Sequence, residues 1–412
     1  MIKPQLSFRS EKQISFLSRN IAQNFANRGH SWTAKIQTIL RDFKEELEMK
    51  SLKELSEEKI QEYVSELKES VENGDIKAET AQTYISALNS IIDYTNYVRD
   101  TNFNSVSAAE NGIHSSADYA DKSVSPETHQ SFQNFLEERY DNTGDERFQA
   151  LELATELQRE FGLRFRESAG LNIFTVEKAL ETGKLELSRE DWTKNARERV
   201  IEIRTEEQKE LLSNVKDFLE NQKSVNLAGA DNWKDYNPIA SFRSFADYNR
   251  QEFNQTYQEQ YNFHGERHFW AQERYSQLWE EKVGIRIEAP IKYYSEQLQQ
   301  AGWDGSGKFY DAVLELNIKP FWEYVQEEIL STKQEELNFP DLFQSESSEV
   351  TSEPDIFSLN EQPEQQEYTQ ENLLEMPDLS DLFEIDKEIR LEISEELGHS
   401  RLDITNTYLG HP

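Results

Sequence analysis

The sequence predicts a mainly α-helical protein of two domains with one small β-hairpin. Apolar residues recur at helical intervals through residues 10–100, and two short alternating runs lie near residue 200. The first pattern indicates amphipathic helices and the second indicates strands. A small, polar and weakly periodic segment, residues 101–127, separates the two regions. Because 412 residues exceed one ordinary core, we treat that segment as a linker between domains.

The first predicted domain, residues 1–100, consists of amphipathic helices. In residues 31–50 the apolar positions recur at helical spacing behind Ser31, which we expect to cap the helix; they are Trp32, Ile36, Ile39, Leu40, Phe43 and Leu47. Further helices are expected in residues 56–71 and 77–98, separated by the turn sequence ENGD. Taken alone, these helices are as consistent with a packed module of no defined function as with a binding domain.

The second predicted domain, residues 128–412, begins with helices and continues into a hairpin. A helix is expected to end at Gly162. Leu185–Ser188 and Val200–Arg204 are the two strands, which we expect to pack on helices because an isolated hairpin is only marginally stable. Residues 331–385 are acidic and rich in Gln, Ser and Pro, so we expect a disordered insertion there.

Composition excludes several classes of protein. The chain has no cysteine, which rules out disulfides, thiolate zinc sites and cysteine nucleophiles. No stretch approaches the roughly 20 apolar residues of a membrane helix, and the first residues lack the apolar core of a secretory signal. We therefore expect a cytoplasmic protein with no membrane partner.

The net charge of −35 argues against a nucleic-acid ligand, because proteins that bind nucleic acid are normally basic. The charge is unevenly distributed, however. Residues 1–50 carry nine Lys and Arg against five Asp and Glu, whereas residues 331–390 carry three against 17. The second segment therefore holds −14 of the total, and the remaining −21 is still acidic.

Four separated stretches contain residue types that act together on phosphates. They are FGLRFRES, WTKNARERV, FHGERH and LGHSRLDITNTYLG, and they supply Arg164, Lys194, His264, Arg267, His399 and Tyr408. In this order they resemble the tyrosine recombinase (phage integrase) family. The last stretch is the most specific, because Leu-Gly-His is followed by Thr405 and by a tyrosine at the family's interval.

The resemblance covers residues 128–412 and implies a mixed α/β catalytic domain dominated by helices. Residues 1–100 are similar, by pattern only, to the family's helical, SAM-like core-binding domain. The implied function is site-specific cleavage and rejoining of double-stranded DNA through a 3′-phosphotyrosine intermediate, without metal or cofactor. The implied assembly is a homo-tetramer on DNA, in integration, excision or resolution.

The implied nucleophile is Tyr408, because a covalent phosphotyrosine conserves the bond energy for rejoining. A free phenol has a pKa near 10, so about 4 kcal/mol separates it from phenolate at neutral pH. Nearby cations must supply part of that energy. Arg164 and Arg267 would bind the non-bridging oxygens and stabilise the charge of the pentavalent transition state.

The remaining roles concern protons. Lys194, in the turn of the hairpin, would protonate the departing 5′ oxygen as general acid. His264 would assist proton transfer at the tyrosine, and His399 would donate to a non-bridging oxygen. A free 5′ hydroxyl would then attack in the reverse step.

The sequence departs from the family pattern in three places. Glu266 stands before the arginine, where an apolar residue is more usual. Arg267 and His399 are 132 positions apart, so an insertion fills the gap, helical in its first part. We hypothesise that its acidic tract occupies the DNA groove until a true site displaces it. Only four residues follow Tyr408, which is too short for exchange of a C-terminal helix, so the insertion is expected to support assembly instead.

Other interpretations of the same residues remain open. A type IB topoisomerase shares the chemistry, a catalytically silent relative would only bind DNA, and an acidic helical scaffold would not contact DNA at all. Arg166 is a rival for the position of Arg164, and Lys194 is also consistent with a solvated cation. His264 and His268 have the i, i+4 spacing of a zinc pair, but the sequence offers no evident third ligand.

Overall fold

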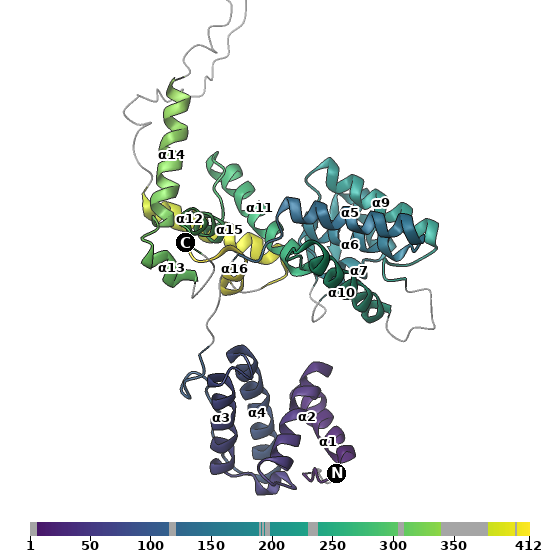
Figure 1. The fold of residues 1–412 in the computed structure, drawn as a ribbon, viewed down its shortest axis with the longest axis vertical. Helices are drawn as coiled ribbons and strands as arrows, with labels where there is room; N and C mark the ends of the chain where they lie inside the picture. The colour runs from purple at the N-terminus through teal and green to yellow at the C-terminus, as the bar shows by residue number, and fades with distance from the viewer. Residues whose placement is uncertain are drawn as a thin grey trace, which may run out of the picture. The chain divides into compact units, whose positions relative to one another are not determined.

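The computed structural model describes residues 6–114, 121–188, 191, 193, 198–229, 238–303, 309–338, 378–399 and 402–412. The chain divides into two compact units, Met1–Asp118 and Tyr119–Pro412. Both are built mainly from helices, and the described residues contain one sheet of two strands (Figure 1). The mainly α fold class with a small hairpin is therefore confirmed.

The first unit is a helical bundle with its own core. Its helices are α1 (Glu11–Arg19), the π-helix η1 (Asn20–Phe25), α2 (His30–Glu45), the 3₁₀ helix η2 (Leu52–Glu54), α3 (Glu57–Glu72) and α4 (Ala78–Arg99). The apolar positions predicted in α2 lie in that core, apart from the half-buried Trp32. The predicted Ser31 cap is wrong, because α2 begins at His30 and Gly29 occupies the N-cap position.

Residues 103–113, which the sequence assigned to the linker, pack against the first unit. Val106 and Ile113 are buried in its core. The Asn89 side chain donates to the carbonyl of Val106 at 2.9 Å and accepts from its N–H at 2.8 Å. Asn96 binds the backbone of Phe103 in the same two ways. Hydrogen bonds from these amide side chains therefore fix residues 103–113, a segment that has no periodic apolar face.

The second unit carries all the residues that resemble a recombinase site. Its elements are α5 (Pro126–Thr143), α6 (Arg147–Phe161), α7 (Phe165–Ala169), α8 (Ile173–Thr182), β1 (Lys184–Leu187), β2 (Arg199–Glu202), α9 (Glu206–Gln222), α10 (Pro238–Tyr257), α11 (Phe263–Val283), α12 (Pro290–Gln300), α13 (Phe309–Glu315), α14 (Phe321–Asn338), α15 (Leu379–Glu396) and α16 (Leu402–Leu409). Helix α6 ends at Gly162 with φ of 59°, as the sequence predicted.

The predicted hairpin is present and packs on helices. Strands β1 and β2 are antiparallel, with Leu185 opposite Ile201 and Leu187 opposite Arg199. These four side chains are buried, whereas Val200 is exposed. Because alternate residues of a strand share a face, Arg199 points to the same inner face as Ile201. Helix α8 packs against β1, and α15 packs against β2.

Helix α11 connects the two cores of the second unit. The first core of this unit includes Phe263 at the start of this helix, together with residues of α5 to α10. The second core includes buried residues between Trp270 and Trp279 of the same helix, together with residues of α12 to α16. Figure 1 accordingly shows α11 between the group that contains α5, α6 and α9 and the group that contains α12, α15 and α16. His264 and Arg267 therefore lie where the two cores meet.

The predicted disordered insertion, residues 331–385, is helical at both ends. Helix α14 continues to Asn338, and α15 begins at Leu379. Residues 339–377 lie outside the described residues. The part of the insertion that precedes the acidic tract forms α12, α13 and α14, as the sequence predicted.

Candidate functional site

Arg267 is fully buried on α11 and is held by oxygens from three elements. Its Nη1 donates to the carbonyl of Gly162, its Nη2 to the carbonyl of Leu397 at 2.6 Å, and its Nε to the hydroxyl of Tyr408 at 3.2 Å. Gly162 and Leu397 are the C-caps of α6 and α15. The partial negative charge at a helix C-terminus stabilises a cation. The guanidinium is therefore fixed and stabilised before any ligand binds.

Arg164 reaches the same place from the N-cap position of α7. Its backbone N–H and its Nη1 donate to the carboxylate of Glu167, at 2.8 and 2.7 Å. Its Nη2 donates to the carbonyl of Leu397 at 3.3 Å, so Arg164 and Arg267 share one acceptor. Arg166, the rival position, is exposed.

Three imidazoles surround the phenol of Tyr408, which is 4% exposed. The ring centroid of Tyr408 lies 5.6 Å from that of His264 and 6.0 Å from that of His399. His268 lies closer, at 4.7 Å, and the sequence assigned it no role in the reaction. Its spacing of four from His264 was the available signal, because residues i and i+4 share a helix face.

The two histidines of α11 are held neutral. Desolvation, followed by the charges of Arg267, Arg164 and Lys122, lowers the pKa of His264 to about 4. Desolvation, followed by the effects of His264, Lys122 and Arg267, lowers the pKa of His268 to about 3. At neutral pH both rings are therefore unprotonated, although the lowered pKa values make them weak bases. A neutral imidazole beside a phenol is the arrangement that activates an oxygen nucleophile.

Helix α16, which carries Tyr408, is held on the second core by α15. Arg390 Nη1 donates to the carbonyl of Gly410 at 2.9 Å and to Oδ1 of Asn406 at 3.0 Å. Its Nε donates to Asp386 at 2.6 Å, and Asp386 also accepts from the hydroxyl of Tyr275 at 2.6 Å. The unit therefore presents its tyrosine to its own arginines.

Arg199 is a third guanidinium of the site and was missed from the sequence. Its side chain is 3% exposed, and its Nη2 donates to Glu167 at 2.6 Å. Desolvation and then the positive charge of Arg267 lower its pKa to about 9, which leaves it charged at neutral pH. Arg164 and Arg199 thus bind the carboxylate of Glu167, and the charge of Arg267 also acts on it, which gives these four groups a formal charge of +2 in a chain of −35.

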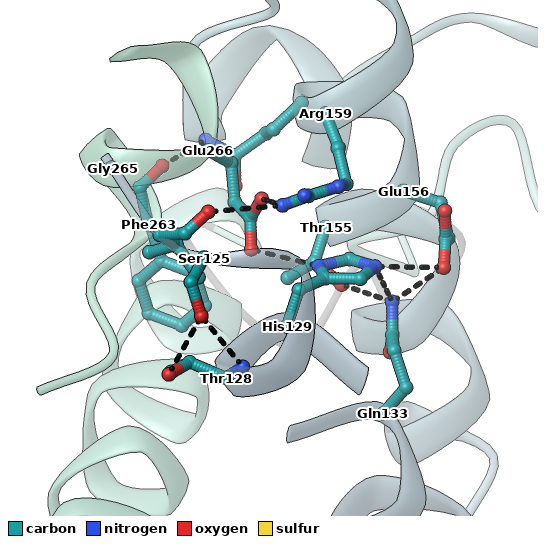
Figure 2. A network of polar contacts seen from close by, with 12 residues as sticks. Ser125, Thr128, His129, Gln133, Thr155, Glu156, Arg159, Phe263, Gly265 and Glu266 are labelled. Atoms are coloured by element: carbon teal, nitrogen blue, oxygen red, sulfur yellow. Dashed lines mark hydrogen bonds and ion pairs between the residues drawn. The ribbon is translucent and has the colours of Figure 1, made fainter. Parts of the chain in front are cut away.

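Glu266, which departs from the family pattern, has a structural role in the second unit. It is fully buried and accepts from Arg159 at 2.7 Å and from Nδ1 of His129 at 2.8 Å. Figure 2 shows its carboxylate between these two side chains, with Glu156 on the far side of the His129 ring. Desolvation acts to lower the pKa of His129, but the hydrogen bonds to Glu156 and Glu266 raise it to about 9.

Lys194 lies outside the described residues, and its role as general acid stays a prediction. The strands on either side of it end at Leu187 and begin at Arg199. Among the described residues, Lys122 is a lysine near the site, because its charge acts on both His264 and His268. Of the other five predicted residues, four come together around the fifth, Tyr408.

A cavity of ≈ 1190 Å³ opens beside these residues. Its lining is contributed by β2, α11, α15 and the turn after α15, and comprises Glu198, Arg199, Val200, Glu202, Arg204, Arg274, Glu281, Glu392, Glu395, Glu396, Gly398 and His399. Among the described residues, no group of three His, Asp or Glu side chains is arranged to bind a metal ion.

Comparison with known protein families, curated proteins and solved structures finds no match for this chain. None of the helices in the described ranges is long and apolar enough to cross a membrane. The function must therefore be inferred from the site itself, in which a buried phenol contacts a guanidinium and neutral imidazoles stand beside it.

Proposed function

We propose that the second unit breaks and rejoins DNA as a site-specific tyrosine recombinase or integrase, with Tyr408 as nucleophile. One observation carries this proposal. Residues predicted from three stretches as far apart as Arg164 and Tyr408 meet around a single phenol, and the guanidinium of Arg267 donates to its oxygen at 3.2 Å. Chance packing of unrelated residues would not gather this set.

In the proposed reaction, Arg164 and Arg267 bind the non-bridging oxygens of one phosphodiester. The negative charge of the bound phosphate would raise the pKa of His264 from about 4 and make its imidazole a stronger base. The oxygen of Tyr408 attacks phosphorus, its proton passes to that imidazole, and the bond from phosphorus to the 5′ oxygen breaks. Lys194 gives its proton to that leaving oxygen. The product is a 3′-phosphotyrosine and a 5′ hydroxyl, and attack by a partner strand's 5′ hydroxyl reverses the step.

The described arrangement is a closed form of this site. Three of the five N–H groups of Arg267 already donate to protein oxygens, and one of these acceptors is the nucleophile itself. Binding of a phosphate oxygen would replace the hydrogen bond from Arg267 to Tyr408. This exchange frees the phenol for attack only when a substrate is present.

The excess of acidic residues predicts weak nonspecific binding to DNA at moderate salt. Phosphate contacts release counterions, so affinity falls as the salt concentration rises. In a chain of charge −35 the local +2 of the site is a small attraction, and the basic stretch at residues 1–50 would supply further phosphate contacts. Double-stranded DNA and a homo-tetramer on it are the proposed partner and assembly, in the cytoplasm.

The test is covalent capture of DNA. Fragments from both sides of the coding region are incubated with the protein, and adducts that survive detergent but not protease are recovered and sequenced. Wild-type protein is expected to form an adduct at a defined site, and Tyr408→Phe to form none. Tyr248→Phe, which changes a tyrosine that is 66% exposed on α10, is the matched control and should react normally.

The same preparation separates the rival functions. Relaxation of supercoiled plasmid without exchange of partners would indicate type IB topoisomerase activity. A gel shift at low salt without any adduct would indicate a silent DNA-binding protein. Absence of both the shift and the adduct would contradict a role on DNA and favour a scaffold.

A further inference from the structure

Two donors of Arg199 are buried without a protein partner. Its Nη2 is bound to Glu167, but no described atom accepts from its Nε or Nη1. A buried donor left unsatisfied costs about 1–3 kcal/mol. Buried donors in native proteins almost always have a partner, so a ligand or an ordered molecule is expected at this place.

Arg199 and the glycine at position 398 line the same cavity. Gly398 has φ of +68° and lines the cavity next to His399. A Cβ at this position would lie 3.2 Å from Cδ and 3.6 Å from Nη1 of Arg199, and 4.0 Å from Nη1 of Arg164. Two guanidiniums therefore approach one point that carries no side chain.

The cavity beside this point is lined by side chains of both charges. Several glutamates line the cavity, but those nearest its other arginines are already paired. Glu396 is bound to Arg204 and Arg274, and Glu281 and Glu392 are bound to Arg274 as well. Glu167, the acceptor of Arg199, is shared with Arg164. Oε2 of Glu396 also lacks a hydrogen-bond partner, and Glu198 and Glu395 line the same cavity. The case for an anion therefore rests on the two unsatisfied donor atoms of Arg199, which match the oxygens of a phosphate.

We infer that Arg199 is a third phosphate-binding residue, which uses its free donors together with Arg164 to hold a phosphate oxygen beside Gly398. The inference rests on the proposed function for the identity of that phosphate, the one that Tyr408 attacks. Arg199 would then stabilise the negative charge that develops in the transition state, from a rigid strand rather than from the hairpin turn.

The first experiment needs no DNA. Thermal unfolding of the whole protein is measured in inorganic phosphate and in chloride of equal ionic strength. Phosphate is expected to raise the melting temperature of the wild type by a few degrees, because a ligand that binds only the folded state stabilises it. Arg199→Lys keeps a charge beside Glu167 but lacks the Nε and Nη1 donors that the planar guanidinium holds in place, and should lose most of this rise. Arg204→Gln is the control, since Arg204 lines the same cavity but is bound to Glu396.

A second variant tests whether a lost response to phosphate could result from misfolding. The double variant Glu167→Gln with Arg199→Met removes both charges, so no buried carboxylate is left unpaired. It should melt normally in chloride and show no response to phosphate. A wild type that does not respond to phosphate, or an Arg199→Lys variant that responds fully, would overturn the inference.

The second experiment measures the rate of adduct formation on the captured DNA. Arg199→Lys is expected to slow the single-turnover rate by on the order of 10²- to 10³-fold, as loss of one transition-state donor does, with little change in DNA affinity. A normal rate would reject the role of Arg199 and leave the recombinase proposal intact. If wild-type protein forms no adduct, the recombinase proposal fails, and the phosphate experiment alone decides whether Arg199 binds an anion.

Discussion

At the scale of single residues, His129 links the stability of the second unit to pH. Its ring lies between Glu266 and Glu156, and these contacts raise its pKa from 6.5 to about 9. A histidine with a raised pKa stabilises the fold fully below its unfolded pKa and loses that contribution as pH rises through its folded pKa. The contribution, on the order of 3 kcal/mol, should therefore disappear between pH 6.5 and 9.

Denaturant unfolding across that range checks this expectation. The wild type should lose about 3 kcal/mol of unfolding free energy as pH rises through the window, whereas His129→Gln should lose much less. His264 and His268 have lowered pKa values, so they change the stability of the fold only at pH values below 6.5, outside this range. An equal loss in both proteins would show that His129 is not responsible.

Gly265 is a second residue with a defined cost of substitution. A Cβ there would lie 2.6 Å from the carbonyl oxygen of Lys122 and 2.6 Å from Val124. Because the first obstacle is backbone, Gly265→Ala should destabilise the second unit by about 1–3 kcal/mol and displace the neighbouring His264. Thermal unfolding measures the loss. Gly29→Ala, where no atom lies within 4 Å, should cost less than about 1 kcal/mol.

The site residues differ in how far the sequence could reveal them. Tyr408 and His399 follow from their fixed interval, and Arg267 follows from its pairing with His264. Arg199 was missed because only the strand register turns it inward, opposite Leu187. The sequence showed Glu266 only as a departure from the family pattern. Its structural role could not be predicted, because its partner, Arg159, is 107 positions away in the chain. Long-range ion pairs of this kind leave no local pattern.

At the scale of elements, the short helix α16 depends on one buried arginine of α15. Arg390 and Asp386 have side chains that are 6% and 7% exposed, and Arg390 also binds the carbonyl of Gly410. Breaking a buried ion pair by removing one partner costs about 3–5 kcal/mol. The loss of Arg390 should therefore release the segment that carries Tyr408.

Hydrogen exchange of residues 402–412 tests this dependence. Arg390→Met should accelerate exchange in this segment and reduce adduct formation, while the helices of the first core stay protected. Lys387→Met changes the exposed pair of Lys387 with Glu384 on the same helix and should leave both measurements unchanged. Equal protection of α16 in the two variants would contradict the proposed anchoring.

Elements were easier to predict than their ends. The helices and the hairpin could be predicted from the spacing of apolar residues, because an element that buries one face must repeat apolar residues at its own period. The cap at Ser31 failed, since the chain enters α2 one residue earlier. Residues 103–113 pack through the side-chain amides of Asn89 and Asn96, and hydrogen bonds from side chain to backbone have no periodicity to detect.

At the scale of the whole molecule, the balance of charge is the main obstacle to DNA binding. Residues 340–376 contain ten acidic residues and no lysine, arginine or histidine. If this tract competes with DNA for the groove, as hypothesised from its charge, its removal should strengthen nonspecific binding and steepen the dependence on salt, because more cations would then contact phosphates.

Two variants test the effect of the tract on affinity. One deletes residues 340–376, and the other replaces its ten acidic residues with Asn and Gln while its length is kept. Both leave α14 and α15 intact, since these helices end at Asn338 and begin at Leu379. Tighter nonspecific binding by both variants at low salt, measured by fluorescence anisotropy, is expected. Unchanged affinity of the neutral variant would eliminate competition by charge.

The long segment between α14 and α15 also allows the second unit to be divided into two separate polypeptides. Residues 378–412 bury Leu382, Ile389, Ile393 and Leu397 against the second core and carry the tyrosine, while every arginine of the site belongs to the earlier part of the chain. A polypeptide of residues 1–338 and a peptide of residues 378–412 should therefore reassemble spontaneously. Such complementation would place strand cleavage under the control of an added peptide, so that its onset could be timed at will.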